Sequence, residues 1–213
     1  PNTGGMGAYC PADAGDPAYT WRDGSVPAGI TQVMDTIIAP TLRAMHERGM
    51  PFRGLLYCGV MLTPTGPRVV EFNCRFGDPE TQAVLMALAD DAPLLRVMLQ
   101  IARGERIAPV PVFVPAQAVV TTVLAAAGYP TMPRSGDAIV VPAMPADAWL
   151  FHAGTVMRDG ALTTSGGRVL AATATGATLT AAQQRSTALA ASVQFTGAFF
   201  RRDIGWRALA RGA

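Results

Sequence analysis

The sequence contains no lysine, only three cysteines and two histidines, and no long uninterrupted apolar run. Without lysine there is no Walker-type phosphate loop, no Schiff-base nucleophile and no attachment residue for biotin or lipoate. The cysteines lie far apart and form no C-x-x-C pair, so neither a disulfide framework nor a zinc site is indicated. No apolar run approaches the ~18 residues that a membrane-spanning helix needs. We therefore expect a cytoplasmic protein with reduced thiols and no membrane partner.

All 17 basic residues are arginines, and they are scattered along the chain. Because they form no cluster and the net charge is only +2, we expect no nucleic-acid partner. Half of the 213 residues are apolar, which is enough for the core of one large domain or two small ones. The chain begins at Pro1 inside a glycine-rich stretch rather than with Met. We therefore expect it to be the C-terminal part of a longer protein.

Helical periodicity recurs in the first half of the chain. Apolar residues at a spacing of 3.6 predict a helix that starts near Pro27 and ends at Gly49, with Pro40 expected to kink or divide it. A second helix is predicted after Asp78, which is a good N-cap and precedes a proline suited to the first helical position. A third helix is predicted over residues 93–103, because a glycine follows its last periodic residue.

Strands are predicted on both sides of the proline-rich segment 107–115, which we interpret as a domain boundary. Before it lies a hairpin, with strands at residues 54–62 and 68–74 and a turn at 64–67. After it, strands are predicted at residues 118–126, 137–141, 149–152, 154–157, 161–164 and 168–173, with hairpin turns at 158–160 and 165–167 and a late helix capped by Thr180. The predicted fold class is α+β: an antiparallel sheet with helices, followed by a small antiparallel β-rich domain with one helix.

Polar side chains alternate along the second strand of the predicted hairpin. Successive side chains of a strand point to opposite faces, so Glu71, Asn73 and Arg75 share one face. A carboxylate and an amide oxygen at this spacing can converge on Mg²⁺, which keeps waters and substrate phosphates in its shell. Arg75 adds a fixed fork for a phosphate or carboxylate, as phosphoryl transfer from ATP requires. The pattern alone nevertheless favours an ordinary half-exposed strand whose polar residues face water.

The glycine-rich stretch at the beginning of the chain is a second candidate site. Gly4, Gly5 and Gly7 would let backbone N–H groups approach an anion closely. Their spacing is not G-x-G-x-x-G, so the stretch is not a dinucleotide fingerprint, and a plain flexible loop is the simpler interpretation. The whole of residues 1–27 is predicted to be irregular. His152 follows three apolar residues of a predicted strand and is interpreted as structural.

Five short segments resemble motifs of one enzyme family. They are PNTGGMGAY at residues 1–9, EFNCRFGDPE at 71–80, FHAGT at 151–155, GGRVL at 166–170 and DIGWR at 203–207. In this order along the chain they resemble the phosphoribosylamine–glycine ligases, also called glycinamide ribonucleotide synthetases, of the ATP-grasp superfamily. The resemblance covers roughly the C-terminal half of the family's length.

The resemblance implies two domains: residues 1–113, the C-terminal portion of an ATP-grasp domain, and residues 114–213, a small β-rich C-terminal domain. It also implies an ATP-dependent carbon–nitrogen ligase of purine biosynthesis. In that reaction ATP phosphorylates the carboxylate of glycine, and the amine of 5-phosphoribosylamine then displaces phosphate from glycyl phosphate. The implied partners are these small molecules, and the implied full-length enzyme is a monomer.

The resemblance also implies roles for particular residues. Glu71 and Asn73 would bind Mg²⁺ or Mn²⁺, and Arg75 would be the catalytic arginine near the acyl phosphate. The substrate loop would comprise Asn2, Thr3, Gly4, Gly5, Met6 and Gly7. Because the family's ATP lid and N-terminal domain lie outside the matching part, we expect the isolated chain to be inactive, to bind ATP poorly and to expose an apolar face. Two alternatives stay open: another ATP-grasp carboxylate–amine ligase, and a non-catalytic scaffold module.

Overall fold

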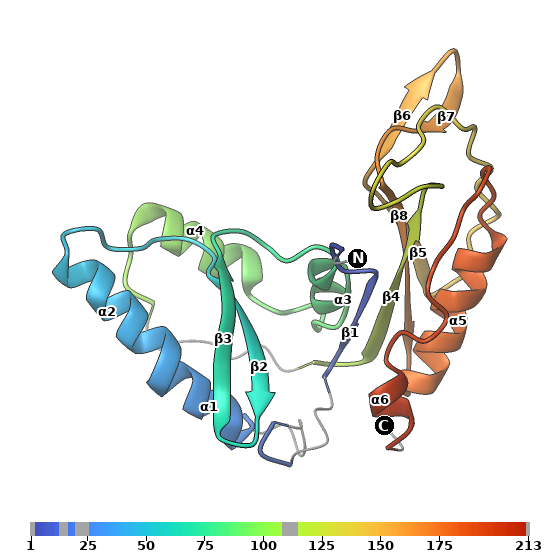
Figure 1. The fold of residues 1–213 in the computed structure, drawn as a ribbon. Coiled ribbons are helices and arrows are strands. Elements are labelled where there is room, and N and C mark those ends of the chain that lie inside the picture. The colour runs from blue at the N-terminus through green and yellow to red at the C-terminus, as the bar shows by residue number, and fades with distance from the viewer. Residues whose placement is uncertain (1–2, 13–16, 20–25, 108–114, 212–213) are drawn as a thin grey trace. The chain divides into compact units, whose positions relative to one another are not determined.

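The computed structural model describes residues 3–12, 17–19, 26–107 and 115–211 (Figure 1). The chain divides into two compact units that interleave along the sequence. The sheet unit comprises Pro1–Pro11, Asp78–Ala87 and Pro115–Ala213, and the hairpin unit comprises Ala12–Gly77 and Leu88–Val114. The proposed site residues are therefore divided, since the Glu71–Arg75 segment belongs to the hairpin unit and the glycine loop to the sheet unit.

The first predicted helix exists, and its regular hydrogen bonding is interrupted next to Pro40 as expected. It consists of α1 (Ala28–Val33), a π-helical turn η2 (Met34–Ile38) and α2 (Ala39–Glu47). At the end of the π turn, the N–H of Ala39 donates to the carbonyl of Met34, five residues earlier. Pro40 has no N–H to donate, so the wider turn and the restart of the α-helix accommodate it without ending the helical segment.

The hairpin and the third helix also form at the predicted places. Strands β2 (Tyr57–Thr63) and β3 (Gly66–Asn73) pair antiparallel. Helix α4 (Leu94–Arg103) ends at Gly104, whose φ of 70° is the left-handed conformation typical of a glycine C-cap. A short 3₁₀ turn, η1 (Pro17–Tyr19), lies within the stretch predicted to be irregular.

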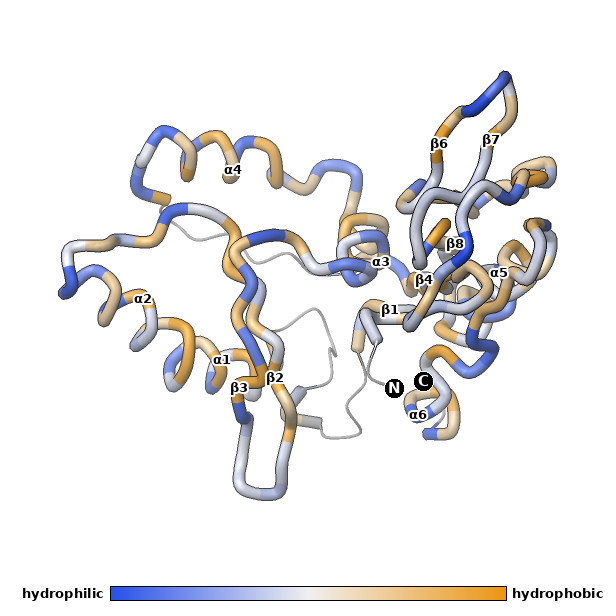
Figure 2. The backbone as a smooth tube through the Cα atoms, turned by 45° about the horizontal axis from the view of Figure 1, so that its top comes forward, coloured by the Kyte–Doolittle hydropathy of each residue, from blue (hydrophilic) through white to orange (hydrophobic). Residues whose placement is uncertain are grey.

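The hairpin unit has little core of its own. Among its described residues, only Pro27, Gly29 and Gly77 are buried, whereas Val70 and Leu95 are 65% and 80% exposed. Figure 2 shows hydrophobic stretches along α4 and the β2–β3 hairpin. Exposed large apolar side chains that gather in one unit are unusual for a free protein surface.

The sheet unit is built on four antiparallel strands in the order β1-β4-β8-β5. A separate two-stranded ribbon, β6–β7, lies in the same unit. The strands are β1 (Gly7–Cys10), β4 (Ala118–Ala125), β5 (Ala148–His152), β6 (Thr155–Arg158), β7 (Ala161–Thr164) and β8 (Arg168–Gly176), and the helices are α3 (Glu80–Met86), α5 (Leu179–Ser192) and α6 (Trp206–Leu209). Helices α3 and α5 both pack on the central strand β4.

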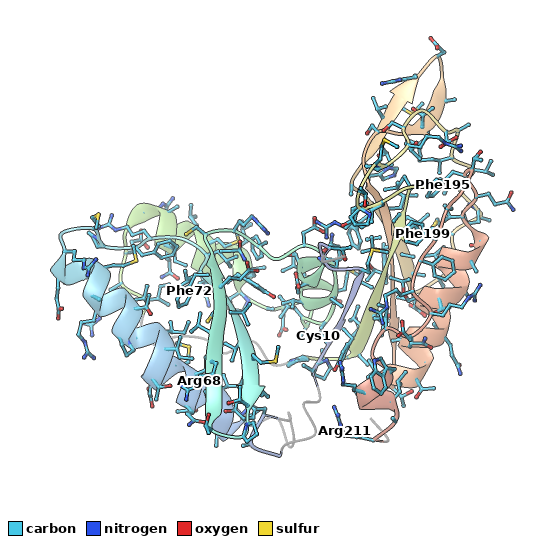
Figure 3. All side chains as sticks on the ribbon, in the orientation of Figure 1. Cys10, Arg68, Phe72, Phe195, Phe199 and Arg211 are labelled. Atoms are coloured by element: carbon cyan, nitrogen blue, oxygen red, sulfur yellow. The ribbon has the colours of Figure 1, made fainter. Side chains whose placement is uncertain are left out.

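The core of the sheet unit lies on both faces of the sheet. The neighbouring residues Val119 and Val120 point in opposite directions, and Val119 packs with Ala83 of α3 while Val120 packs with Leu179 of α5. Because helices cover both faces, β4 and β8 are buried almost throughout and show no alternation of apolar and polar residues. Phe195, labelled in Figure 3, belongs to the buried cluster that includes Leu189 and Ala190 of α5.

Four local predictions differ from the structure. Residues 7–10 form β1, which exists only because it pairs with the distant β4. Residues 137–141 form isolated bridges to Thr163 and Gln194 rather than a strand. The 165–167 segment is not a hairpin turn, since β7 pairs with β6 and β8 with β4 and β5. Helix α5 begins earlier than predicted, with Thr178 rather than Thr180 as its cap: the Thr178 hydroxyl accepts from the N–H of Ala181 at 3.2 Å.

No helix in the described part of the chain is long and apolar enough to cross a membrane.

Candidate metal and substrate site

Strand β3 places Glu71 and Asn73 on one face, as alternation predicts. Across the hairpin, Glu71 pairs with Gly59 and Asn73 with Tyr57 in regular register. A β-bulge follows immediately, because Val60 pairs with Val69 and leaves Val70 without a partner on β2. Bulges of this kind are frequent next to active sites, where they redirect the strand.

The two side chains have free oxygen atoms. Glu71 is exposed and Asn73 is half-buried, and neither side chain has a hydrogen-bond or ion-pair partner among the residues that the structure describes. Phe72, labelled in Figure 3, lies between them in the sequence and points to the other face of the strand. A carboxylate and an amide oxygen on one face are the hard donors that Mg²⁺ or Mn²⁺ prefers.

The donor set fits a cation that receives most of its ligands from elsewhere. The described residues contain no group of three or more His, Cys, Asp or Glu side chains able to hold a metal. Glu71 and Asn73 supply two oxygens, so waters and substrate phosphates would have to complete the shell, which is the usual arrangement of Mg²⁺ in phosphoryl-transfer sites.

Arg75 lies outside the strand, so the prediction that it shares a strand face with Glu71 and Asn73 is wrong. The strand ends at Asn73, and residues 74 and 75 form a bend. The guanidinium Nη1 of Arg75 donates to the carbonyl of Phe76 at 2.8 Å, and the residue is exposed. One donor is thus used locally, and the rest of the fork stays available to an anion.

The glycine loop is held by its carbonyl groups. The Gly5 carbonyl accepts from Arg168 Nη1 at 3.2 Å, and the Met6 carbonyl accepts from the N–H of Val123 at 3.0 Å. The N–H groups of Gly4 and Gly5 donate to no other described residue. Of the predicted loop residues Asn2–Gly7, Thr3 to Gly7 are described and lie together, and Asn2 falls outside the described residues.

Asp78 is not a helix cap, which corrects the sequence interpretation. The N-cap of α3 is Pro79, with no side-chain cap hydrogen bond. Asp78 Oδ2 instead accepts from Arg168 Nη2 at 2.9 Å, and Arg168 Nη1 donates to the Asp78 carbonyl at 2.9 Å. Local sequence could not reveal this pairing, because the two residues are 90 positions apart.

Parts of four of the recognised segments meet at one end of the four-stranded sheet. Arg168 begins β8 in the GGRVL segment, and its backbone carbonyl accepts from the N–H of Gly154 in the FHAGT segment at 2.9 Å. His152 ends β5 there, and its Nδ1 is 2.9 Å from the hydroxyl of Thr155. The Gly5 contact brings the glycine loop to the same end. Asp78 of the EFNCRFGDPE segment also binds Arg168, so these groups surround one half-buried guanidinium.

Two residues of the site were missed by sequence reasoning. Gly59 faces Glu71, and a Cβ built on it would lie 3.3 Å from Glu71 Cγ. Arg168 connects the loop to Asp78. The only available signal for either was position: Gly59 interrupts an apolar strand, and Arg168 lies in a recognised segment.

Comparison with known proteins identifies two matching family models. Residues 1–81 match the model described as phosphoribosylglycinamide synthetase, ATP-grasp (A) domain. Residues 119–207 match the model described as phosphoribosylglycinamide synthetase, C domain. Together the two models cover most of the chain.

Curated relatives and solved structures agree with these matches. The chain is 45% identical to a phosphoribosylamine–glycine ligase of Mesorhizobium japonicum and 44% identical to one of Pseudomonas aeruginosa, covering 99% of this chain and 47% of each relative. The crystal structure of the Thermotoga maritima phosphoribosylamine–glycine ligase matches with a TM-score of 0.78 and 35% identity over 96% of this chain and 47% of that one. A biotin carboxylase from Campylobacter jejuni shares the fold, with a TM-score of 0.61, 12% identity, and coverage of 96% of this chain and 42% of that one. The chain thus spans about half the length of the curated relatives it matches.

Proposed function

This chain belongs to the phosphoribosylglycinamide synthetase family, and we propose that it is the metal-binding and C-terminal portion of an ATP-dependent ligase that joins glycine to 5-phosphoribosylamine. The observation that carries the proposal is the pair of unpartnered oxygen donors, Glu71 and Asn73, on one face of β3 inside the matched ATP-grasp segment. In the proposed reaction, a glycine carboxylate oxygen takes the γ-phosphoryl group of ATP and ADP leaves. The amine then attacks the activated carbonyl carbon, the C–O bond to phosphate breaks, and the amine loses a proton.

Glu71 and Asn73 are the proposed metal ligands. The bound ion, Mg²⁺ or Mn²⁺, would neutralise charge on the ATP phosphates. Glu71 contributes the negative charge, and Asn73 contributes a neutral oxygen at a fixed distance along a paired strand. The antiparallel hydrogen bonds of β2 and β3 hold both residues in place, so little reorganisation is needed when the ion binds.

Arg75 is the proposed catalytic arginine. Its guanidinium keeps N–H donors beyond the one used on Phe76, and a fixed positive fork stabilises negative charge on a phosphoryl group in transfer. The loop Asn2–Gly7 is the proposed substrate loop. The N–H groups of Gly4 and Gly5 have no acceptor among the described residues, and this supports the role because such groups can bind an anion. The Gly5 carbonyl, in contrast, already accepts from Arg168.

The remaining assignments follow from the same proposal. We place the protein in the cytoplasm, consistent with three free cysteines, as a monomer that acts on small molecules. The division into residues 1–113 and 114–213 is proposed as the domain boundary. The exposed apolar residues of β3 and α4 support the proposal that another part of the full-length ligase covers the hairpin unit, so the isolated chain should be inactive and prone to self-association.

The test is product analysis with the full-length ligase. Glycine, 5-phosphoribosylamine and ATP should give the ribonucleotide amide, ADP and phosphate in equal amounts, and replacing glycine with other carboxylic acids should abolish the product. Amide formation from another acid at a higher rate would favour a different ATP-grasp ligase, and no ADP release with any acid would favour a scaffold. The variant E71A should abolish turnover at Mg²⁺ concentrations that saturate the unmodified enzyme.

A further inference from the structure

Arg168 connects three backbone segments at the end of the sheet. Its Nη1 donates to the carbonyls of Gly5 and Asp78, at 3.2 and 2.9 Å, and its Nη2 donates to Asp78 Oδ2 at 2.9 Å. The side chain is only 24% exposed, whereas that of Asp78 is 48% exposed. The guanidinium is therefore partly enclosed by the segments that it binds. Arg168 is itself the first residue of the buried strand β8.

The glycines of the loop are shaped to this contact. A Cβ on Gly4 would lie 3.1 Å from Arg168 Cζ, and a Cβ on Gly5 would lie 2.6 Å from Pro79 Cδ. Neither glycine has a positive φ, so close approach and not backbone conformation is the reason for the missing side chains. The loop, the turn at Asp78–Pro79 and Arg168 thus form one packed group within the sheet unit.

We propose that Arg168 is a positioning residue of the ligase: it fixes the substrate loop and the turn that follows the Glu71–Arg75 segment against the end of the sheet. This inference rests on the proposed function. Only a planar fork with several N–H donors reaches both carbonyls and the carboxylate together, and a lysine ammonium on a flexible stem cannot do so in one geometry.

Loss of the Arg168 contacts should cost little folding stability. A partly exposed ion pair contributes about 0–1 kcal/mol to folding, so loss of the Arg168–Asp78 pair should leave the sheet folded. A displacement of a substrate-binding segment by about 1 Å can reduce catalysis by about 100-fold. The residue should therefore affect turnover much more than unfolding.

The experiment uses the full-length ligase with R168K, R168Q and D78N. Arg185 provides the matched control, because it donates to the Thr175 carbonyl at 2.9 Å and lies 3.9 Å from Asp147 at the opposite end of β8. Backbone 15N order parameters are measured without substrates for residues 3–7, for residues 78–82 and for β4. Steady-state kinetics then give kcat and KM for the amine substrate and the Mg²⁺ concentration at half-maximal rate.

We expect R168K and R168Q to lower the order parameters of residues 3–7 and 78–82 from rigid values of about 0.85 to below about 0.6 while β4 stays rigid, and R185Q to change neither segment. The same two variants should lower kcat/KM for the amine about 100-fold with the Mg²⁺ requirement unchanged, and D78N should lie between them and the unmodified enzyme. Unchanged order parameters in R168Q, full activity in R168K, or loosened segments with normal turnover would each overturn the proposal. Order parameters are measured without turnover, so a ligase that makes no product would defeat the proposed function and leave the mobility result interpretable.

Discussion

Gly59 lies directly opposite Glu71 in the β2–β3 hairpin, and a Cβ at Gly59 would come within 3.3 Å of Glu71 Cγ. The absent side chain therefore leaves room for the glutamate to lie over the neighbouring strand. This relationship assigns Gly59 a role in placing a proposed metal ligand, although the residue itself has no group that could bind an ion.

Replacing Gly59 tests this relationship. In the full-length ligase, G59A should move Glu71 by a few tenths of an ångström. The Mg²⁺ concentration at half-maximal rate should then rise several-fold, which corresponds to a loss of ~1 kcal/mol of Mg²⁺ binding free energy. C58A on the same strand, whose side chain lies on the other face, is the control. Mg²⁺ titrations of the rate decide the matter, and an unchanged midpoint in G59A would contradict the role.

The cap of α5 can be assigned by a pair of threonine variants. T178A removes the hydroxyl that accepts from Ala181 N–H, and it should lower the free energy of unfolding by about 1 kcal/mol. T180A should have little effect, because Thr180 is inside the helix. Urea unfolding of both variants distinguishes them, and a larger loss in T180A would restore the sequence-based assignment.

A buried polar link holds α5 to the sheet. Ser186 is fully buried, lies with its Oγ 2.7 Å from the Thr122 hydroxyl, and donates to the Ala172 carbonyl at 2.9 Å. S186A should cost about 1–3 kcal/mol, because it leaves buried polar atoms without a partner. Ser192 is exposed, and its hydroxyl donates to the Leu189 carbonyl of the same helix, so S192A is the control and should cost less. Equal unfolding midpoints for the two variants would contradict this account.

The three cysteines should differ in their reactivity toward an alkylating agent. Burial raises the pKa of Cys10 to about 11, and it also raises the pKa of Cys58, whereas Cys74 is exposed. Iodoacetamide at pH 8 should therefore modify Cys74 first and Cys10 last, as peptide mass spectrometry can establish.

The raised pKa of Cys10 also makes folding stability depend on pH. Below pH 9 the thiol is protonated in both the folded and the unfolded chain, so its contribution is constant. Above pH 9 the unfolded chain loses this proton while the folded chain keeps it, and stability should fall until pH reaches about 11. C10A should show a smaller loss across this window, and an identical pH profile would refute the assignment.

Local sequence signals predicted the elements that local interactions determine. The Gly104 cap ended α4 at the predicted residue, and Asp159 and Gly160, with φ values of 49° and 78°, form the predicted turn between β6 and β7. Alternation placed Glu71 and Asn73 on one face, because both lie in a regularly paired part of β3.

Long-range partners account for what the sequence did not predict. Strand β1 is only four residues long and is defined by its pairing with β4, more than 100 residues later. Asp78 has the residue type and position of a helix cap, but its carboxylate pairs with Arg168 instead. Arg168 also donates to the backbone carbonyls of Asp78 and Gly5. Arg75 was predicted to continue the strand face of Glu71 and Asn73, but the strand ends at Asn73, and no local sequence signal marks that end.

The most direct test of the central claim is metal binding by Glu71 and Asn73. Mn²⁺ is titrated into the full-length ligase with ADP present, and the free ion is followed by electron paramagnetic resonance. E71Q and N73A should each weaken Mn²⁺ binding about tenfold or more, equivalent to ~1.4 kcal/mol, while E47Q at the exposed end of α2 should bind as the unmodified protein does. Unchanged Mn²⁺ affinity in both E71Q and N73A would contradict the claim.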